Sequence, residues 1–208
     1  MPSPLKLYDL AASPNNVKVR LALAFKKIPY ERVAVDPQDR QMLIQVSGQP
    51  LAPVLVHGDT VLFDSSAILR YLDANFRSGP RLFSPERERM KQIEDWEMFS
   101  RTQASEPVGL VFRQLRADPR DEASLRRAND LINKAAARVE EALAKTPYLM
   151  GDAPNAADFS VAPFLNLAAL SAEAETKAPF LALFRKSLDL KGAPRTRDWI
   201  ARVMALDR

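Results

Sequence analysis

Two short pairs of residues have side chains that could bind a ligand or take part in a reaction at the positions where they stand. Ser13 stands directly before Pro14, and Asp64-Ser65 stands directly before a run with apolar residues at helical spacing. Ser and Asp are typical caps of a helix N-terminus, and proline suits the first helical position. A helix start also offers unpaired N–H groups and the positive end of the helix dipole, which can hold an anion. From the residues alone, each pair is either a plain helix cap or part of an anion site.

Several kinds of site are excluded by composition. The chain has no cysteine and one histidine, His57. Disulfides, thiolate metal ligands and a cysteine nucleophile are therefore excluded, and one histidine is too few for a typical zinc site, so we expect no metal. We expect His57 to be solvated in a hairpin turn.

Charge and hydropathy restrict the partners. Lys and Arg total 30 against 26 Asp plus Glu, but the excess is spread along the chain and forms no basic block with interleaved aromatics. We therefore expect no nucleic-acid partner. No apolar run has the length of a signal peptide or of a membrane span, which predicts a soluble cytoplasmic protein with no membrane partner.

The elements that must position the two pairs follow from the hydrophobic periodicity. Strands are predicted over 5–8, 30–35, 53–56 and 60–63; helices are predicted from Pro14 to Ile28-Pro29 and over 64–76, with one helical turn near 42–46. Gly58-Asp59 marks a hairpin between the last two strands. The order β-α-β and then β-β-α predicts a small mixed sheet with helices on its faces.

Everything after Ser84-Pro85 is helical in pattern. Helices are predicted over 86–115, 121–145, 155–173, 178–186 and 194–206. Asn155 and Asp158 form a variant capping box before an apolar run, which we assign to stability. The sequence thus predicts an α/β domain over 1–76, a linker over 77–85 and an all-α domain over 86–208.

The chain resembles the cytosolic glutathione S-transferase superfamily in four motifs that occur in the family's order. They are Leu7-Tyr8 with Ser13-Pro14-Asn15 and Val17-Lys18-Val19-Arg20; Ala52-Pro53-Val54-Leu55; Leu62-Phe63-Asp64-Ser65-Ser66 with the helix that follows; and Gly151-Asp152 with Pro154-Asn155 and Ala157-Asp158. The resemblance covers nearly the whole chain and is closest to serine-type, phi-like bacterial and plant members. It implies a thioredoxin-like N-terminal domain, an all-α C-terminal domain and a detoxifying transferase that conjugates glutathione to small apolar electrophiles.

The resemblance also implies which residues hold glutathione. Ser13 would be the catalytic residue, because a hydroxyl that donates to sulfur favours the thiolate. Asp64 and Ser65 would bind the ammonium and the carboxylate of the γ-glutamyl end. Ala52, before a cis-Pro53, would pair through its backbone with the cysteinyl part of the peptide. An ordinary trans edge proline is the alternative.

Other implied roles concern the rest of the substrate and the assembly. Arg40, or less well Gln41, would bind the glycine carboxylate of glutathione. Phe112 and Arg113 would face the electrophile. Arg70 and the helix from Glu86 would lie at a homodimer interface. Glutathione would act as co-substrate, with no cofactor.

One position departs from the family pattern. Leu51 falls where the phi class has a glutamine that helps to bind glutathione, and this predicts weaker binding. A non-catalytic binding or scaffold protein on the same fold is therefore the alternative function. Cysteine-dependent relatives of glutaredoxin or omega type are excluded, because they need a mixed disulfide. A zeta-class isomerase would carry Ser-Ser-Cys where this chain has Ser13-Pro14-Asn15.

Overall fold

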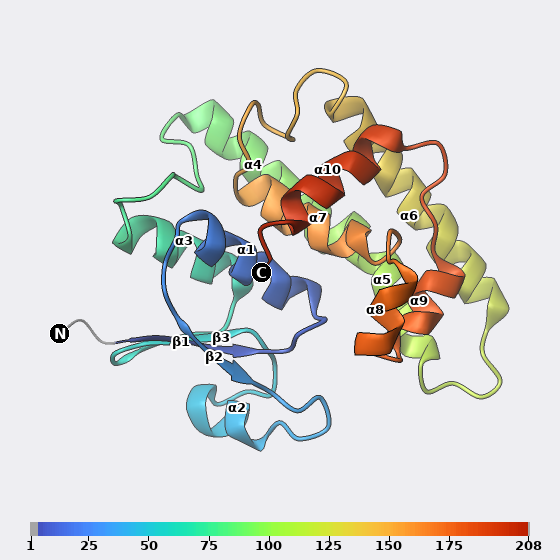
Figure 1. Cartoon of the computed structure of the whole chain (residues 1–208), viewed down its shortest axis with the longest axis horizontal. Coiled ribbons are helices and arrows are strands. Elements are labelled where there is room, and N and C mark those ends of the chain that lie inside the picture. Colours follow the sequence, from blue (N-terminus) through green and yellow to red (C-terminus); the bar gives the residue numbers. More distant parts are fainter. Residues whose placement is uncertain (1–3, 208) are drawn as a thin grey trace. The chain divides into compact units, whose positions relative to one another are not determined.

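The computed structural model describes residues 4–207, which form two compact units. The first contains the chain up to Pro85 together with Leu206 and Asp207, and the second spans Glu86–Ala205. The strands belong to the first unit, whereas the second is built of helices (Figure 1). The predicted fold class, a thioredoxin-like α/β region followed by an all-α region, is confirmed.

The first unit is a four-stranded mixed sheet with three helices. Its elements are β1 (Leu5–Asp9), α1 (Pro14–Phe25), β2 (Glu31–Ala34), α2 (Gln41–Ser47), β3 (Val54–His57), β4 (Thr60–Leu62) and α3 (Ser65–Asn75). The strand order is β2-β1-β3-β4; β1 pairs with β2 in parallel, and the other two pairings are antiparallel. This confirms the predicted element order.

The core of the first unit lies between the sheet and its helices. The apolar residues of α1 recur almost all round the helix, and Val19, Leu21 and Leu23 are fully buried. In α2, Leu43 is buried in a cluster with Val35 and Val54. The helical turn expected near residues 42–46 is therefore a two-turn helix, because Leu43 anchors it to the sheet.

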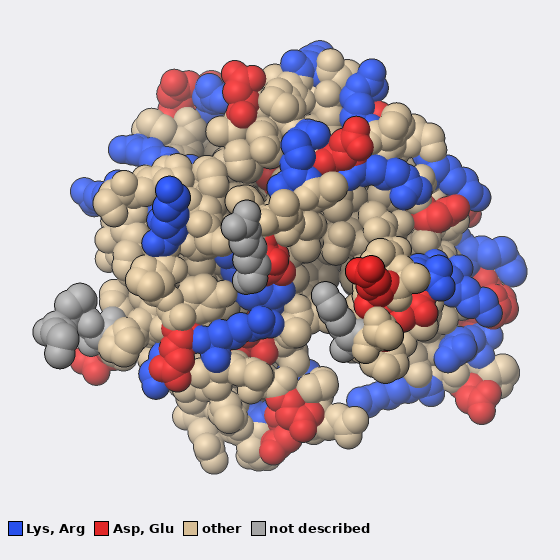
Figure 2. All heavy atoms as spheres, viewed as in Figure 1, with Lys and Arg blue, Asp and Glu red and all other residues tan. Residues whose placement is uncertain are grey.

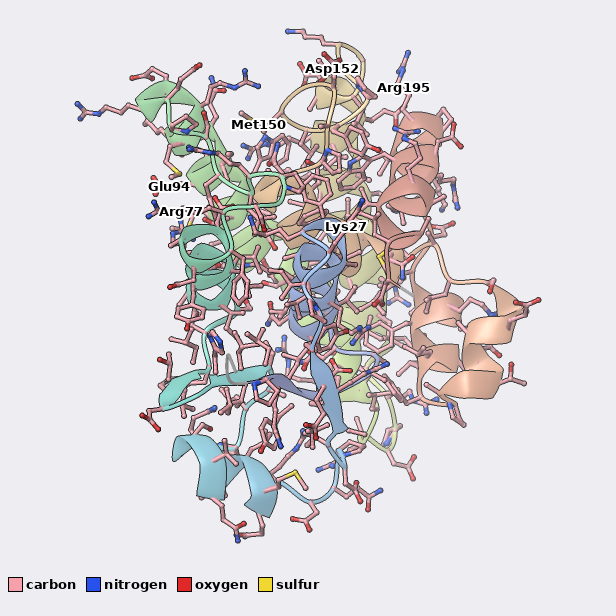
Figure 3. All side chains as sticks on the ribbon, turned by 60° about the vertical axis from the view of Figure 1, so that its left-hand side comes forward. Lys27, Arg77, Glu94, Met150, Asp152 and Arg195 are labelled. Atoms are coloured by element: carbon pink, nitrogen blue, oxygen red, sulfur yellow. The ribbon has the colours of Figure 1, made fainter. Side chains whose placement is uncertain are left out.

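The C-terminal end of α1 comes earlier than Ile28-Pro29, where the sequence predicts it. The helix ends at Phe25, and Lys27 adopts the left-handed conformation with φ of 56°. Figure 3 shows Lys27 at the end of α1 that lies away from the loop leading in from β1. A left-handed residue after the last turn is a common way for a helix to end.

The predicted linker is a packed part of the first unit. Leu82 and Phe83 are buried, and their N–H groups donate to the carboxylate of Asp73. Asp73 also pairs with Lys26 at 2.9 Å. Gly79 is required here, because a Cβ at this position would lie 2.9 Å from the carbonyl oxygen of Lys26. The turn-forming residues at 77–80, which predict a linker, thus form a tight turn.

The second unit consists of α4 (Arg87–Phe99), η1 (Ser100–Ala104), α5 (Ser105–Gln114), α6 (Glu122–Ala142), α7 (Ala156–Asn166), α8 (Ala172–Lys177), α9 (Leu181–Ser187) and α10 (Pro194–Met204). The single helix predicted over 86–115 is interrupted by the π-helical segment η1. Pro107, in the first turn of α5, has no N–H to donate to the preceding turn, which accounts for irregular backbone at this point. The capping box of Asn155 and Asp158 is confirmed.

The expectation for His57 is wrong. His57 ends β3 and is half-buried; its Nδ1 lies 2.8 Å from the Tyr71 hydroxyl, and its ring packs against Phe76. The hairpin turn follows it, so the imidazole contacts α3.

Charge is mixed over the surface. On the face shown in Figure 2, acidic and basic side chains are interspersed. Within residues 4–207, no helix combines the length and the apolar character needed to cross a membrane.

Candidate functional site

The strand register brings three loops to one edge of the sheet. The antiparallel pairing of Tyr8 with Val54 sets the start of β3 beside the end of β1. The pairing of Leu55 with Leu62 sets the end of β4 beside the start of β3. The segments that meet at this edge are residues 10–13, 52–53 and 63–65. The segments with the predicted residues Ser13, Ala52, Pro53, Asp64 and Ser65 are therefore neighbours in space.

Ser13 occupies the N-cap position of α1 without acting as a side-chain cap. Its carbonyl oxygen accepts from Asn16 and Val17, but its hydroxyl makes no hydrogen bond to the first turn of the helix. Ser13 is half-buried. A hydroxyl at the positive end of a helix that is not engaged in capping can donate to a bound anion.

Asp64, in contrast, is a true helix cap. One of its carboxylate oxygens accepts from the N–H of Ser66 at 2.9 Å and of Ala67 at 2.8 Å. The N–H of Ser65, the first residue of α3, is among the orphan donors that a helix start presents. A carboxylate can accept about four hydrogen bonds, so capping leaves capacity for a second partner.

The first turns of α1 and α3 lie next to each other. The Ser65 hydroxyl is 3.5 Å from the Asn15 side-chain oxygen. Deeper in the unit, the ammonium of Lys18 donates to the Ser66 hydroxyl at 2.6 Å. Two helix N-termini thus point their N–H groups and their dipoles at one region, which favours binding of an anionic ligand.

The Ala52–Pro53 peptide bond is cis, as the resemblance implies. The loop before it is ordered by Gln49, whose side-chain amide accepts from the N–H of Leu51 at 2.7 Å and donates to the Leu51 carbonyl at 2.8 Å. The Leu51 side chain is 69% exposed. Leu51, the residue that departs from the family pattern, is therefore an exposed leucine on a loop that is ordered by its own hydrogen bonds. It does not disturb the sheet.

Arg40 lies in the connection that follows β2, directly before α2. Its side chain is half-buried, and its Nη1 is buried with no hydrogen-bond partner among residues 4–207. A buried guanidinium nitrogen without an acceptor is costly, so it fits a site for an anionic group.

The remaining predicted residues belong to segments of the sequence other than those that meet at this edge. Phe112 and Arg113 are exposed on α5 of the second unit, with Phe112 at 62%. Arg70, on α3, lies with its guanidinium carbon 4.7 Å from the centre of the Phe83 ring. Among the described residues, no group of three or more His, Asp or Glu could hold a metal ion.

Sequence reasoning missed three polar residues on α1. Asn16, Lys18 and Arg20 are all buried, at 0%, 4% and 5% exposure. The sequence did indicate that this helix is buried, because its apolar residues recur at mixed three- and four-residue steps, which is typical of a helix buried on most sides. Any polar residue on such a helix needs a partner inside the unit.

Both parts of the chain match family models. The model described as "Glutathione S-transferase, N-terminal domain" matches residues 7–81, and the model described as "Glutathione S-transferase, C-terminal domain" matches residues 122–202. The two matches together span most of the chain.

Individual proteins are similar over much of the length. Glutathione S-transferase F10 of Arabidopsis thaliana is 32% identical over 156 residues, which are 69% of this chain and 72% of that protein. Glutathione S-transferase 3 of Zea mays is 33% identical over 167 residues, or 75% of this chain and 74% of that protein. A crystal structure of a glutathione transferase family member from Pseudomonas fluorescens, with two glutathione bound, has a TM-score of 0.77 at 22% identity and covers 99% of this chain and 90% of that one. At this identity the structural likeness shows a shared fold.

Proposed function

Because the chain belongs to the glutathione S-transferase family and is a glutathione-conjugating enzyme, we propose that Ser13 holds the glutathione sulfur as a thiolate. Within the family the chain is phi-like, as its plant relatives indicate. The observation that carries this proposal is the meeting of the segments 10–13, 52–53 and 63–65 at one edge of the sheet. One tripeptide can span these segments, with its sulfur at the start of α1 and its γ-glutamyl end at the start of α3.

The chemistry at Ser13 concerns the pKa of the glutathione thiol. A free thiol has a pKa of about 8.5, so little of it is thiolate at neutral pH. The Ser13 hydroxyl donates to the sulfur, and the positive end of α1 adds a favourable field; both lower the pKa of the bound thiol. The absence of a capping bond from this hydroxyl supports the role, since its oxygen is not committed to the helix.

The charged groups at the two ends of glutathione are bound by hydrogen-bond donors or by side chains of opposite charge. The Ser65 hydroxyl and N–H receive the γ-glutamyl carboxylate, and the carboxylate of Asp64 pairs with the γ-glutamyl ammonium while it caps α3. The backbone of Ala52 pairs with the cysteinyl part as an added strand would. Arg40 receives the glycine carboxylate, and its unpartnered buried Nη1 supports this role.

The second substrate is a small apolar electrophile, which Phe112 and Arg113 contact. The exposed phenyl ring of Phe112 gives apolar area for such a molecule. The enzyme supplies orientation and electrostatics, and glutathione supplies the nucleophile. We further propose a homodimer in which Arg70 and the helix from Glu86 take part.

Glutathione capture followed by turnover tests the proposal. The chain should bind to immobilised glutathione, elute with free glutathione, and form a conjugate from glutathione and an activated aryl chloride with release of chloride. Ser13→Ala is the matched variant: we expect it to be captured but to turn over slowly. A wild-type chain that is captured but turns over no faster than Ser13→Ala would contradict the role of Ser13.

A further inference from the structure

The guanidinium of Arg20 joins three segments of the first unit. Its Nη1 donates to the carboxylate of Asp9 at 2.6 Å, and its Nη2 donates to the carbonyl oxygen of Ala11 at 2.9 Å. Its Nε and Nη2 also donate to the two carboxylate oxygens of Asp207, each at 2.7 Å. Asp207 follows the end of α10, and Figure 1 shows this end of the chain beside α1. One side chain of α1 thus connects the end of β1, the loop before Ser13 and the segment after α10.

The loop that presents Ser13 depends on α1 for its backbone bonds. The N–H of Leu10 donates to the Asn16 side chain at 3.0 Å, and the N–H of Ser13 donates to the carbonyl oxygen of Leu10 at 3.0 Å. Ala11 lies between these two points, and Arg20 holds its carbonyl oxygen. Two buried polar side chains of the helix, those of Asn16 and Arg20, therefore hold two peptide groups in or next to a loop only four residues long.

Arg20 and Asp9 form a buried ion pair whose remaining charges are balanced by Arg32 and Asp207. Arg20 is 5% exposed and Asp9 is 2% exposed, so both are costly without partners. Asp9 is shared with a second guanidinium, that of Arg32, at 2.5 Å. Burial alone would lower the pKa of Arg20, but the hydrogen bond and the charge of Asp207, together with Asp9, raise it above its usual value. Arg20 and Arg32 bond to different oxygens of Asp9, so without Asp207 this one carboxylate would be left to balance two guanidinium charges.

The planar fork of an arginine can be oriented by a carboxylate that meets it with two parallel bonds. Asp207 meets Arg20 in this way, through Nε and Nη2. Nη2 is also the atom that holds Ala11. Asp9 fixes the Nη1 side of the guanidinium, and Asp207 fixes the Nε and Nη2 side, from which the bond to Ala11 is made. Asp207 is therefore the carboxylate that meets the atom bonded to Ala11.

We propose that Asp207 is a positioning residue for the thiolate site. It orients Arg20, which holds the carbonyl oxygen of Ala11 and thereby sets the place of the Ser13 hydroxyl. The effect on catalysis rests on the proposed role of Ser13, whereas the effect on the loop does not.

The test replaces the carboxylate and follows both the loop and the chemistry. In Asp207→Asn, the amide nitrogen would face an Nη2 donor, so one of the two parallel bonds is lost. We expect faster amide hydrogen exchange over residues 10–16 and a higher pKa of bound glutathione, read from thiolate absorbance. We expect kcat to fall by up to about a hundredfold, as small misplacements of a reacting group can do, with KM for glutathione little changed. Asp207→Glu, which restores the charge, should recover part of the loss.

Arg32→Gln is the matched control. It removes a guanidinium from the same carboxylate, Asp9, but Arg32 donates to Asp9 and not to Ala11. We expect it to leave the exchange of residues 10–16 and the pKa of bound glutathione unchanged. Equal exchange in Asp207→Asn and wild type, or equal acceleration in Arg32→Gln, would overturn the proposal. Faster exchange in Asp207→Asn alone, with the pKa of bound glutathione unchanged, would uphold the positioning of the loop and reject the proposed role of Ser13.

Discussion

The indole N–H of Trp199 donates to the carboxylate of Asp158 at 2.8 Å, so a side chain of α10 reaches the first turn of α7. The same carboxylate accepts from the N–H groups of Leu149 and Asn155, each at 3.0 Å. Asp158 is fully buried, and this burial raises its pKa to about 6 against the opposing effect of its donors. One carboxylate thus serves the capping box and joins two helices of the second unit.

The raised pKa of Asp158 predicts the sign of a pH effect on stability. The native chain keeps its proton up to about pH 6, whereas the unfolded chain releases it near pH 4. The contribution of Asp158 to the free energy of unfolding is therefore fully present below about pH 4 and declines as pH rises to about 6, by up to about 1.4 kcal/mol per pH unit. Urea unfolding of wild type and Asp158→Asn across this range measures it, because the asparagine does not titrate. We expect the stability advantage of wild type to narrow as pH rises, and an advantage that widens would show that the donors outweigh burial.

Ser13→Ala is expected to change chemistry and leave stability almost unchanged. The Ser13 hydroxyl does not cap α1, so its removal should alter the free energy of unfolding by less than about 0.5 kcal/mol. The pKa of bound glutathione should rise toward about 8.5, the value of a free thiol. Thiolate absorbance during a pH titration gives the pKa, and thermal unfolding checks the fold. A variant with the wild-type pKa would exclude Ser13 as the thiolate donor.

Asp64 caps α3 and is proposed to bind the γ-glutamyl ammonium, and two substitutions separate these roles. Asp64→Ala removes both the cap and the charge, so it should cost about 0.5–2 kcal/mol of stability and weaken glutathione binding by about tenfold or more. Asp64→Asn keeps a capping oxygen and loses only the charge, so it should weaken binding with little loss of stability. Calorimetric titration and urea unfolding measure the two effects.

Asp121 provides a matched control for the cap. It caps α6 through the N–H groups of Ala123 and Ser124, in the same way as Asp64 caps α3. Asp121→Ala should lower stability and leave glutathione affinity unchanged. Wild-type affinity in Asp64→Asn would show that the γ-glutamyl ammonium is not bound by this carboxylate.

Leu51→Gln is expected to tighten glutathione binding or leave it unchanged. One added side-chain hydrogen bond contributes about 0.5–1.5 kcal/mol, or up to about tenfold in affinity. The side chain of Leu51 is exposed, and Gln49 bonds to its backbone, so the substitution should not disturb the loop. Met42→Gln, which replaces another exposed apolar side chain of the first unit, is the control and should leave affinity unchanged. Weaker binding in Leu51→Gln, measured by calorimetry, would show that the leucine itself contacts the ligand.

Much of the first unit could be predicted from local sequence signals. Ser13-Pro14 and Asp64-Ser65 mark the starts of α1 and α3, and the alternating runs mark the strands of the sheet. These signals work because capping and periodicity depend on residues close together in the chain. The interruptions of the helices were less predictable. The π-helical segment η1 interrupts the helix predicted over 86–115, and α7 ends at Asn166, although its helix was predicted to continue to residue 173.

The sequence by itself determined the element order, the two helix starts and the chemistry that the absence of cysteine excludes. It could not decide which of two chemically similar caps is engaged: Asp64 bonds to its helix and the Ser13 hydroxyl does not, because that choice depends on side-chain orientation at each turn. Nor could it pair Arg20 with Asp207, which lie 187 positions apart. Buried charges are paired by the packing of distant segments, and only the tertiary structure brings those segments together.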